Sequence, residues 1–195
     1  MGDHVCPWWL AYTFDNPLRN LFHKPEIIFA PYVREGMVVA DLGCGMGYFS
    51  IGLAKIVKEG GKVLAVDIQA KMLEKMAPRA KKQGVLETIY PIQCSELDIG
   101  IAEPLDFALA FWMAHETPEI ERFFAQIHEV LKPGGLFLIT EPKFHVSFDE
   151  YRRELESAAK VGFVLKGEPQ VKFSHAAVLE KPINLLEQYS SSIKV

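Results

Sequence analysis

The sequence predicts an α/β fold in which a doubly wound, mostly parallel, Rossmann-like sheet carries helices on both faces. Short apolar runs that end at an acid alternate with amphipathic helical stretches, which is typical of such sheets. A glycine cluster joins the first apolar run to the first helical stretch. Two late strand-like runs have no helix between them, which indicates a terminal hairpin.

The first half of this pattern predicts three strands and two helices. Strands are expected over 37–40 and 63–66, followed by Asp41 and Asp67, with a helix over 50–57 between them. A second helix is expected over 70–83, where Gly84 suits the end and Pro78 predicts a kink or an early break. A third strand is expected over 87–93.

The second half predicts a strand over 105–111 and a helix over 119–131 with one apolar stripe. The glycines of 132–135 end that helix, and a buried strand is expected over 136–140. Ser147 and Glu150 have the spacing of a capping box for a helix over 148–161. The last two strands are expected near 163–166 and 171–179.

The 195 residues suit a single domain. We expect an N-terminal cap or lid over 1–35, an α/β core over 36–180 and a tail over 181–195. In the cap, Asn16 and Pro17 can start a helix that runs towards Phe29, and Pro31 ends it.

Composition narrows the class of protein. The formal net charge is -4, which argues against a domain that holds nucleic acid through its phosphates. Cys6, Cys44 and Cys94 are too scattered for a disulfide framework, and no metal site is expected. No leader-like or membrane-spanning apolar stretch stands out. The expectation is a cytoplasmic monomer or homodimer.

The most informative stretch runs from Val38 through Asp41 to Gly43, Gly45 and Gly47. Glycines allow backbone amides to approach a ligand, and the N-terminus of the following helix adds positive charge. A nicotinamide dinucleotide is one candidate ligand. The usual dinucleotide fingerprint, however, requires glycine at position 48, which here is tyrosine.

The pattern of Asp41 and the three alternating glycines resembles motif I of the class I S-adenosylmethionine-dependent methyltransferases. Further stretches resemble that family's motifs in the expected order: 66–67, 106–110, 131–135 and 161–163. The nearest general resemblance is to the ubiquinone/menaquinone-biosynthesis-type small-molecule methyltransferases. The resemblance implies strand order 3-2-1-4-5-7-6, with the last strand antiparallel, and methyl transfer to a small-molecule acceptor by in-line displacement.

The resemblance also implies where S-adenosylmethionine binds. Asp67 would accept hydrogen bonds from the ribose hydroxyls, and the loop 43–47 would face the methionyl part. Cys94 stands where many relatives have an aspartate that meets adenine, which shifts that contact towards Ser95 or Glu96. The expected cofactor-binding residues are Asp41, Gly43, Cys44, Gly45, Gly47, Asp67, Ile68, Cys94, Ser95 and Glu96.

Candidate acceptor-side residues follow the fourth and fifth strands. His115 and Glu141 are candidate catalytic bases, although a hydrogen-bonded loop histidine explains His115 equally well. Trp8, Trp9, Tyr12, Trp112 and His145 are candidate substrate or lid residues. The first three could cover the sulfonium with aromatic faces, or could simply pack a cap helix.

Two other functions remain open from the sequence. A nicotinamide-dependent oxidoreductase would use the same strand, glycine loop and acid. A non-catalytic S-adenosylmethionine-binding scaffold protein would keep the fold without turnover.

Overall fold

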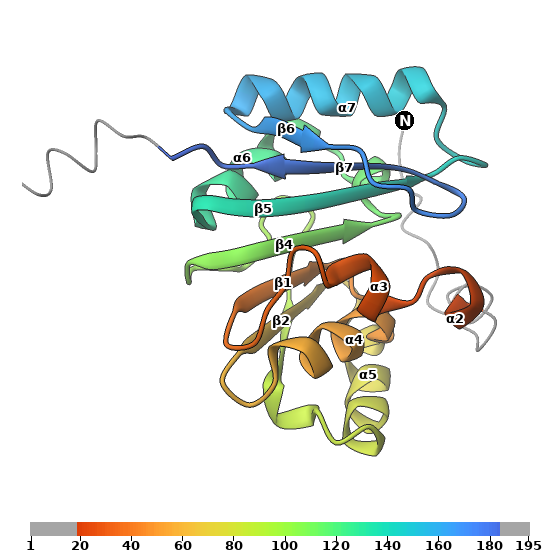
Figure 1. The fold of residues 1–195 in the computed structure, drawn as a ribbon, viewed down its shortest axis with the longest axis vertical. Helices are drawn as coiled ribbons and strands as arrows, with labels where there is room; N and C mark the ends of the chain where they lie inside the picture. The colour runs from red at the N-terminus through yellow and green to blue at the C-terminus, as the bar shows by residue number, and fades with distance from the viewer. Residues whose placement is uncertain (1–18, 184–195) are drawn as a thin grey trace, which may run out of the picture.

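The computed structural model describes residues 19–183. It is a three-layer α/β arrangement whose single sheet lies between two groups of helices (Figure 1). The elements in chain order are α2 (Arg19–Phe22), α3 (Pro25–Phe29), β1 (Val38–Leu42), α4 (Tyr48–Val57), β2 (Lys62–Asp67), α5 (Ala70–Lys82), η1 (Leu86–Thr88), β3 (Ile89–Gln93), β4 (Leu105–Phe111), η2 (Ala114–Glu116), α6 (Ile120–Val130), β5 (Leu131–Pro142), α7 (Phe148–Val161), β6 (Val164–Gly167) and β7 (Ser174–Glu180).

The seven strands follow the order β3-β2-β1-β4-β5-β7-β6, as the family resemblance implied. The first five strands in that order pair in parallel, and β7 is antiparallel to both of its neighbours. The chain passes from the β3 edge back to β4, so the order reverses beside β1. Ligands of such sheets bind at the carboxyl ends of the strands near this reversal.

Alternating side chains of the strands divide the core into two layers. Val39, Phe107 and Leu109 belong to the cluster that packs with α3, α4 and α5. Ala40 and Ala108 belong to the cluster that packs with α6 and α7. Because both faces are covered, the central strands are apolar almost throughout.

The N-terminal helix prediction was wrong in the described part. The chain forms two short helices, α2 and α3, in place of one helix that continues to Phe29. Lys24 has an extended backbone (φ -77°, ψ 112°), and Pro25 opens α3. A residue before proline avoids the helical conformation, so Pro25 separates the two helices.

Other helices and strands differ less from the ranges predicted from the sequence. α5 continues through Pro78 without an early break. β5 begins at Leu131 because Leu131 pairs with Leu105 before the bulge, and regular pairing resumes at Leu136. The capping box of Ser147 and Glu150 at the start of α7 is confirmed. None of the helices within residues 19–183 is both long and apolar enough to span a bilayer.

Candidate functional site

A cavity of about 650 Å³ lies at the carboxyl ends of the parallel strands. Its floor is formed by the ends of β1 and β2 and by the glycine loop. The segments after β3 and β4 form its sides, and Arg19 of α2 and Phe144 after β5 contribute to its wall. The parallel sheet therefore brings residues far apart in sequence to one edge, as its topology requires.

The glycine loop is shaped by hydrogen bonds from its own amides. The Cys44 amide donates to the Val66 carbonyl at 2.9 Å, and the Gly47 amide donates to the Cys44 carbonyl at 3.0 Å. The Gly45 amide donates to Asp67 Oδ2 at 2.8 Å. These three amides fix the loop, so its contribution to a ligand comes mainly from its shape and its exposed backbone edge.

All three loop glycines have positive φ, from 53° at Gly45 to 79° at Gly47. A Cβ added to Gly47 would lie 2.4 Å from the Met76 side chain, whereas one added to Gly45 would meet nothing within 4 Å. Gly45 lines the cavity, so its missing side chain leaves cavity space free.

Asp41 is buried at the end of β1, on the face covered by α4. Its Oδ2 accepts a hydrogen bond from Ser50 Oγ at 2.5 Å. Burial raises the pKa of Asp41 to about 7, although Ser50 and Arg19 oppose that shift. The carboxyl group lines the cavity and is poised between its neutral and ionised forms near pH 7.

Asp67, at the end of β2, is also almost buried and lines the same cavity. Its Oδ1 accepts the Gln69 amide at 2.8 Å, while Oδ2 holds Gly45. Burial raises the pKa of Asp67 despite these two hydrogen bonds. Each carboxylate oxygen can accept a second hydrogen bond, so Asp67 retains capacity for two ligand hydroxyls.

The segment after β3 forms one side of the cavity. Cys94 is half-buried, and burial raises the pKa of its thiol to about 11, so it remains a neutral thiol at pH 7. The Ser95 amide already donates to the Asp98 carbonyl at 3.0 Å. Glu96 and Asp98 both line the cavity, and of these two acids only Glu96 was predicted from the sequence.

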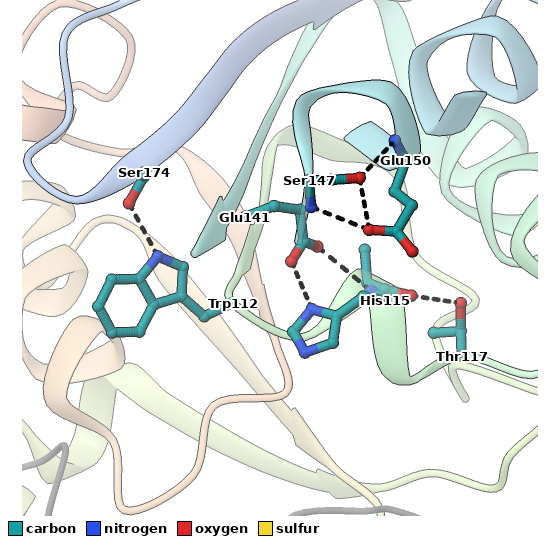
Figure 2. Close-up of polar contacts among 8 residues, drawn as sticks. Trp112, His115, Thr117, Glu141, Ser147, Glu150 and Ser174 are labelled. Carbon is teal, nitrogen blue, oxygen red and sulfur yellow. Dashed lines mark hydrogen bonds and ion pairs between the residues drawn. The ribbon is translucent and has the colours of Figure 1, made fainter. Parts of the chain in front are cut away.

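His115 and Glu141 form a bidentate pair, although they lie 26 positions apart (Figure 2). Glu141 Oε2 is hydrogen-bonded to His115 Nδ1, and Oε1 accepts the His115 backbone amide at 3.3 Å. Glu141 is fully buried in β5. Although burial opposes it, the Glu141 carboxylate raises the pKa of His115. In the neutral imidazole, a proton on Nδ1 satisfies the hydrogen bond to Glu141 and leaves Nε2 as an acceptor.

Aromatic side chains form the wall near α2. The Arg19 guanidinium lies 4.6 Å from the Phe49 ring centroid and 5.6 Å from that of Trp112. Trp112 Nε1 donates to Ser174 Oγ at 2.8 Å, which fixes the ring (Figure 2). Phe144 packs edge-on against Trp112 at 5.3 Å. Such flat faces suit an apolar or aromatic ligand.

The structure brings most of the predicted site residues to this one cavity. Those that line it are Asp41, Gly43, Cys44, Gly45, Asp67, Ile68, Cys94, Ser95, Glu96, Trp112, His115 and His145. Gly47 caps α4 beneath the loop, and Glu141 lies behind His115. Trp8, Trp9 and Tyr12 lie outside the described residues.

Several lining residues were missed from the sequence. Arg19, Tyr48 and Met113 gave no pattern of their own, because their position depends on tertiary packing. For Tyr48, its position directly after the glycine loop was a sequence signal that could have placed it near the cavity. Within residues 19–183, no three His, Cys, Asp or Glu side chains are grouped so as to hold a metal ion.

Comparison with known proteins gives a consistent result. Residues 39–135 match the family model described as a methyltransferase domain. The chain is 30% identical over 131 residues to sterol methyltransferase-like 1 of Botryococcus braunii, a match that covers 67% of this chain and 33% of that protein. It is 31% identical over 110 residues to a ubiquinone/menaquinone biosynthesis C-methyltransferase of Haemophilus ducreyi, covering 56% and 42% of the two chains.

The fold also has close counterparts among solved structures. A SAM-dependent methyltransferase from Aquifex aeolicus superimposes with a TM-score of 0.77 at 24% identity, covering 88% of this chain and 97% of that one. The matches to curated relatives such as those from B. braunii and H. ducreyi, by contrast, span only about a third to less than half of those proteins.

Proposed function

The chain belongs to the class I S-adenosylmethionine-dependent methyltransferases, and we propose that it methylates a small-molecule acceptor whose nucleophilic atom carries a proton. This proposal rests on one observation, a cavity that is lined both by the candidate cofactor residues and by the candidate base. Asp67 and the glycine loop line one part of this cavity, and His115 lines another part. One end has the donors and acceptors for the cofactor, and the other has a base beside an aromatic wall.

The residues present fit S-adenosylmethionine, which the family uses. Two buried acids, Asp41 and Asp67, line the cavity, and burial raises the pKa of both. A ligand with positive charge and a ribose diol compensates such acids better than a second anion would. The space left by Gly45 and the free acceptor capacity of Asp67 support the same assignment.

When bound, S-adenosylmethionine supplies a methyl group on a sulfonium, which a nucleophile accepts by in-line displacement. The protein must position the acceptor and, where the acceptor is protic, remove its proton. His115 Nε2 is the acceptor of that proton in our proposal. Glu141 keeps the other ring proton on Nδ1 and stabilises the imidazolium that forms.

The aromatic wall narrows the acceptor class. Trp112, Phe144 and Tyr48 offer flat apolar faces, and Arg19 adds one cation among them. We infer a flat or apolar acceptor with a hydroxyl or similar protic group, delivered towards His115. The relatives named for sterol and ubiquinone/menaquinone biosynthesis have names consistent with apolar acceptors.

Calorimetry with S-adenosylhomocysteine and with NADH tests the cofactor assignment. We expect S-adenosylhomocysteine to bind and NADH not to bind. Asp67→Ala should weaken S-adenosylhomocysteine binding on the order of 10- to 100-fold, because the lost hydrogen bonds involve a charged acceptor. Asp149→Asn, on the exposed start of α7, is the matched control and should bind normally.

Binding of NADH alone would overturn the assignment in favour of a nicotinamide-dependent oxidoreductase. Binding of S-adenosylhomocysteine without turnover of any protic acceptor would favour a scaffold protein. A screen of phenols and other flat hydroxyl compounds, with release of S-adenosylhomocysteine as the readout, separates that case from an active enzyme.

A further inference from the structure

A second cavity, of about 400 Å³, shares His115 with the first one. Thr117 and His145 also line both cavities, so His115 lies at their boundary. The wall of the second cavity is completed by α7, including the solvent-exposed Glu150 and Arg153. It therefore gives the base a route to solvent that does not pass through the cofactor cavity.

Glu154 of α7 also lines this second cavity. Its Oε2 is buried and has no hydrogen-bond partner among residues 19–183. Burial, helped by the nearby Glu141, raises the pKa of Glu154 to about 8, whereas His115 lowers it. A carboxyl group with this behaviour is neutral at pH 7 until a positive charge forms beside it.

The surroundings of Glu154 are mixed in charge. α6 contributes the apolar Ile120 to the cavity wall. The titratable and charged groups around the Glu154 carboxyl are His115 of η2, Glu141 of β5, His145 before α7, and Glu150, Tyr151 and Arg153 of α7. Of these, His115 is the one whose charge changes in the proposed reaction.

We propose that Glu154 is a positioning residue for His115, neutral while the imidazole is neutral and ionised while the imidazolium exists. This inference rests on the proposed role of His115 as the base. Glu141, His115 and Glu154 together then carry one net negative charge both before and after the proton transfer. A buried cluster of constant charge avoids the cost of an uncompensated charge in a low-dielectric site.

The protons balance in two steps. The acceptor's proton moves to His115 Nε2 as its heteroatom forms the new bond to the methyl carbon, and the Glu154 proton passes to water in the second cavity. After product release, the proton on His115 returns through that cavity to Glu154. One proton leaves the protein for each acceptor proton removed, and no oxidant or reductant is involved.

Nuclear magnetic resonance titration of His115 in the ligand-free protein tests this coupling without turnover. Glu154→Gln should lower the His115 midpoint, because the carboxylate that stabilises the imidazolium is absent. Glu156→Gln removes the same charge from the exposed side of the same helix and should leave the midpoint unchanged. An unchanged midpoint in Glu154→Gln would overturn the proposal.

The reciprocal measurement needs no variant at Glu154. In the unaltered protein, the carboxyl carbon of Glu154 should titrate well above the ordinary glutamate pKa of 4.5. In His115→Gln the Glu154 midpoint should rise further, because the neighbouring positive charge cannot form. A Glu154 midpoint near 4.5, or one that is unchanged in His115→Gln, would exclude the coupling even if Glu154→Gln failed to fold.

Kinetics then separates this inference from the proposed function. Glu154→Gln should reduce kcat roughly 3- to 10-fold with KM nearly constant, and should move the acidic limb of the pH profile to lower pH. If S-adenosylhomocysteine does not bind, the proposed function fails whatever the titrations show. If it binds and turnover is normal in Glu154→Gln, only the role of Glu154 fails.

Discussion

Glu141 occupies an unusual position for a carboxylate. It lies inside β5, fully buried, and both of its oxygens are directed to His115. A buried acid is tolerated where a partner compensates its charge, and here the partner is the candidate base itself. In the proposed function, this pair serves proton transfer: Glu141 orients His115 and stabilises its imidazolium.

The pH dependence of turnover follows from this pair. His115 accepts a proton only as neutral imidazole, so activity should rise with pH through its pKa, which Glu141 keeps above the ordinary value of 6.5. His115→Gln should reduce kcat on the order of 100- to 10,000-fold with a protic acceptor. Glu141→Gln should lower both kcat and the midpoint of the acidic limb, since the imidazolium loses its stabilising partner.

Steady-state rates from pH 5 to 9 measure both effects. Glu156→Gln, on the exposed side of α7, removes a charge that does not act on His115 and serves as the charge-matched control. An acidic limb that stays in place in Glu141→Gln would contradict the assignment of His115 as the titrating base.

Asp41 is a second residue whose burial costs stability. The ordinary pKa of 3.8 is raised to about 7 in the folded protein, so the fold favours the protonated acid. The unfolded chain ionises near 3.8, and stability from this group is therefore lost as pH rises from about 4 to about 7 and then levels off. Asp41→Asn should stabilise the ligand-free protein at pH 8 by on the order of 2–4 kcal/mol.

Urea unfolding at pH 5 and pH 8 measures this difference, and the gain should be larger at pH 8. The amide retains an acceptor for Ser50 Oγ, so the hydrogen bond of 2.5 Å has a replacement. The same variant should bind S-adenosylhomocysteine more weakly. A gain in stability that does not change with pH would show that Asp41 is not the group that titrates.

At the scale of elements, the turn between β1 and α4 depends on its glycines in different ways. Gly45→Ala adds a Cβ where φ is 53° and cavity space is free, so binding should suffer more than stability. Gly84→Ala, after α5, adds a Cβ at φ 70° with nothing within 4 Å. Both should lose about 1–2 kcal/mol from left-handed backbone alone.

Calorimetry and thermal melting distinguish these two variants. We expect Gly45→Ala to lose at least about tenfold in S-adenosylhomocysteine affinity, because the new methyl group enters the ligand's space, whereas Gly84→Ala keeps normal affinity. Equal affinities in the two variants would mean that the Gly45 edge does not face the cofactor.

The elements also show what a sequence can and cannot predict. The helix over 148–161 was predictable because Ser147 and Glu150 are local signals, and the glycine loop was predictable because its spacing is local too. The hydrogen bond between His115 and Glu141 was not, since it depends on how β4 and β5 align. The position of Arg19 in the cavity wall was not predictable either, because Arg19 lies in α2, a separate short helix that the sequence did not indicate.

At the scale of the whole molecule, the sheet separates stability from chemistry. Apolar side chains of the central strands fill both core layers, while the carboxyl edge collects Asp41, Asp67 and the segment that bears His115. The same edge is approached by the N-terminal part of the chain, because Arg19, the first described residue, lines the cavity.

This placement gives the lid hypothesis for Trp8, Trp9 and Tyr12 its sharpest test. Removal of residues 1–14 should reduce turnover at least about tenfold, since water would reach the acceptor and the sulfonium would lose aromatic cover. S-adenosylhomocysteine affinity should stay within about threefold, because the residues that hold it belong to the core.

A variant in which Trp8, Trp9 and Tyr12 are all changed to alanine keeps the length of the chain unchanged. Steady-state kinetics and calorimetry on both proteins decide between the hypotheses: unchanged turnover means that these aromatic residues only pack, while a parallel loss of affinity means that they belong to the cofactor site itself.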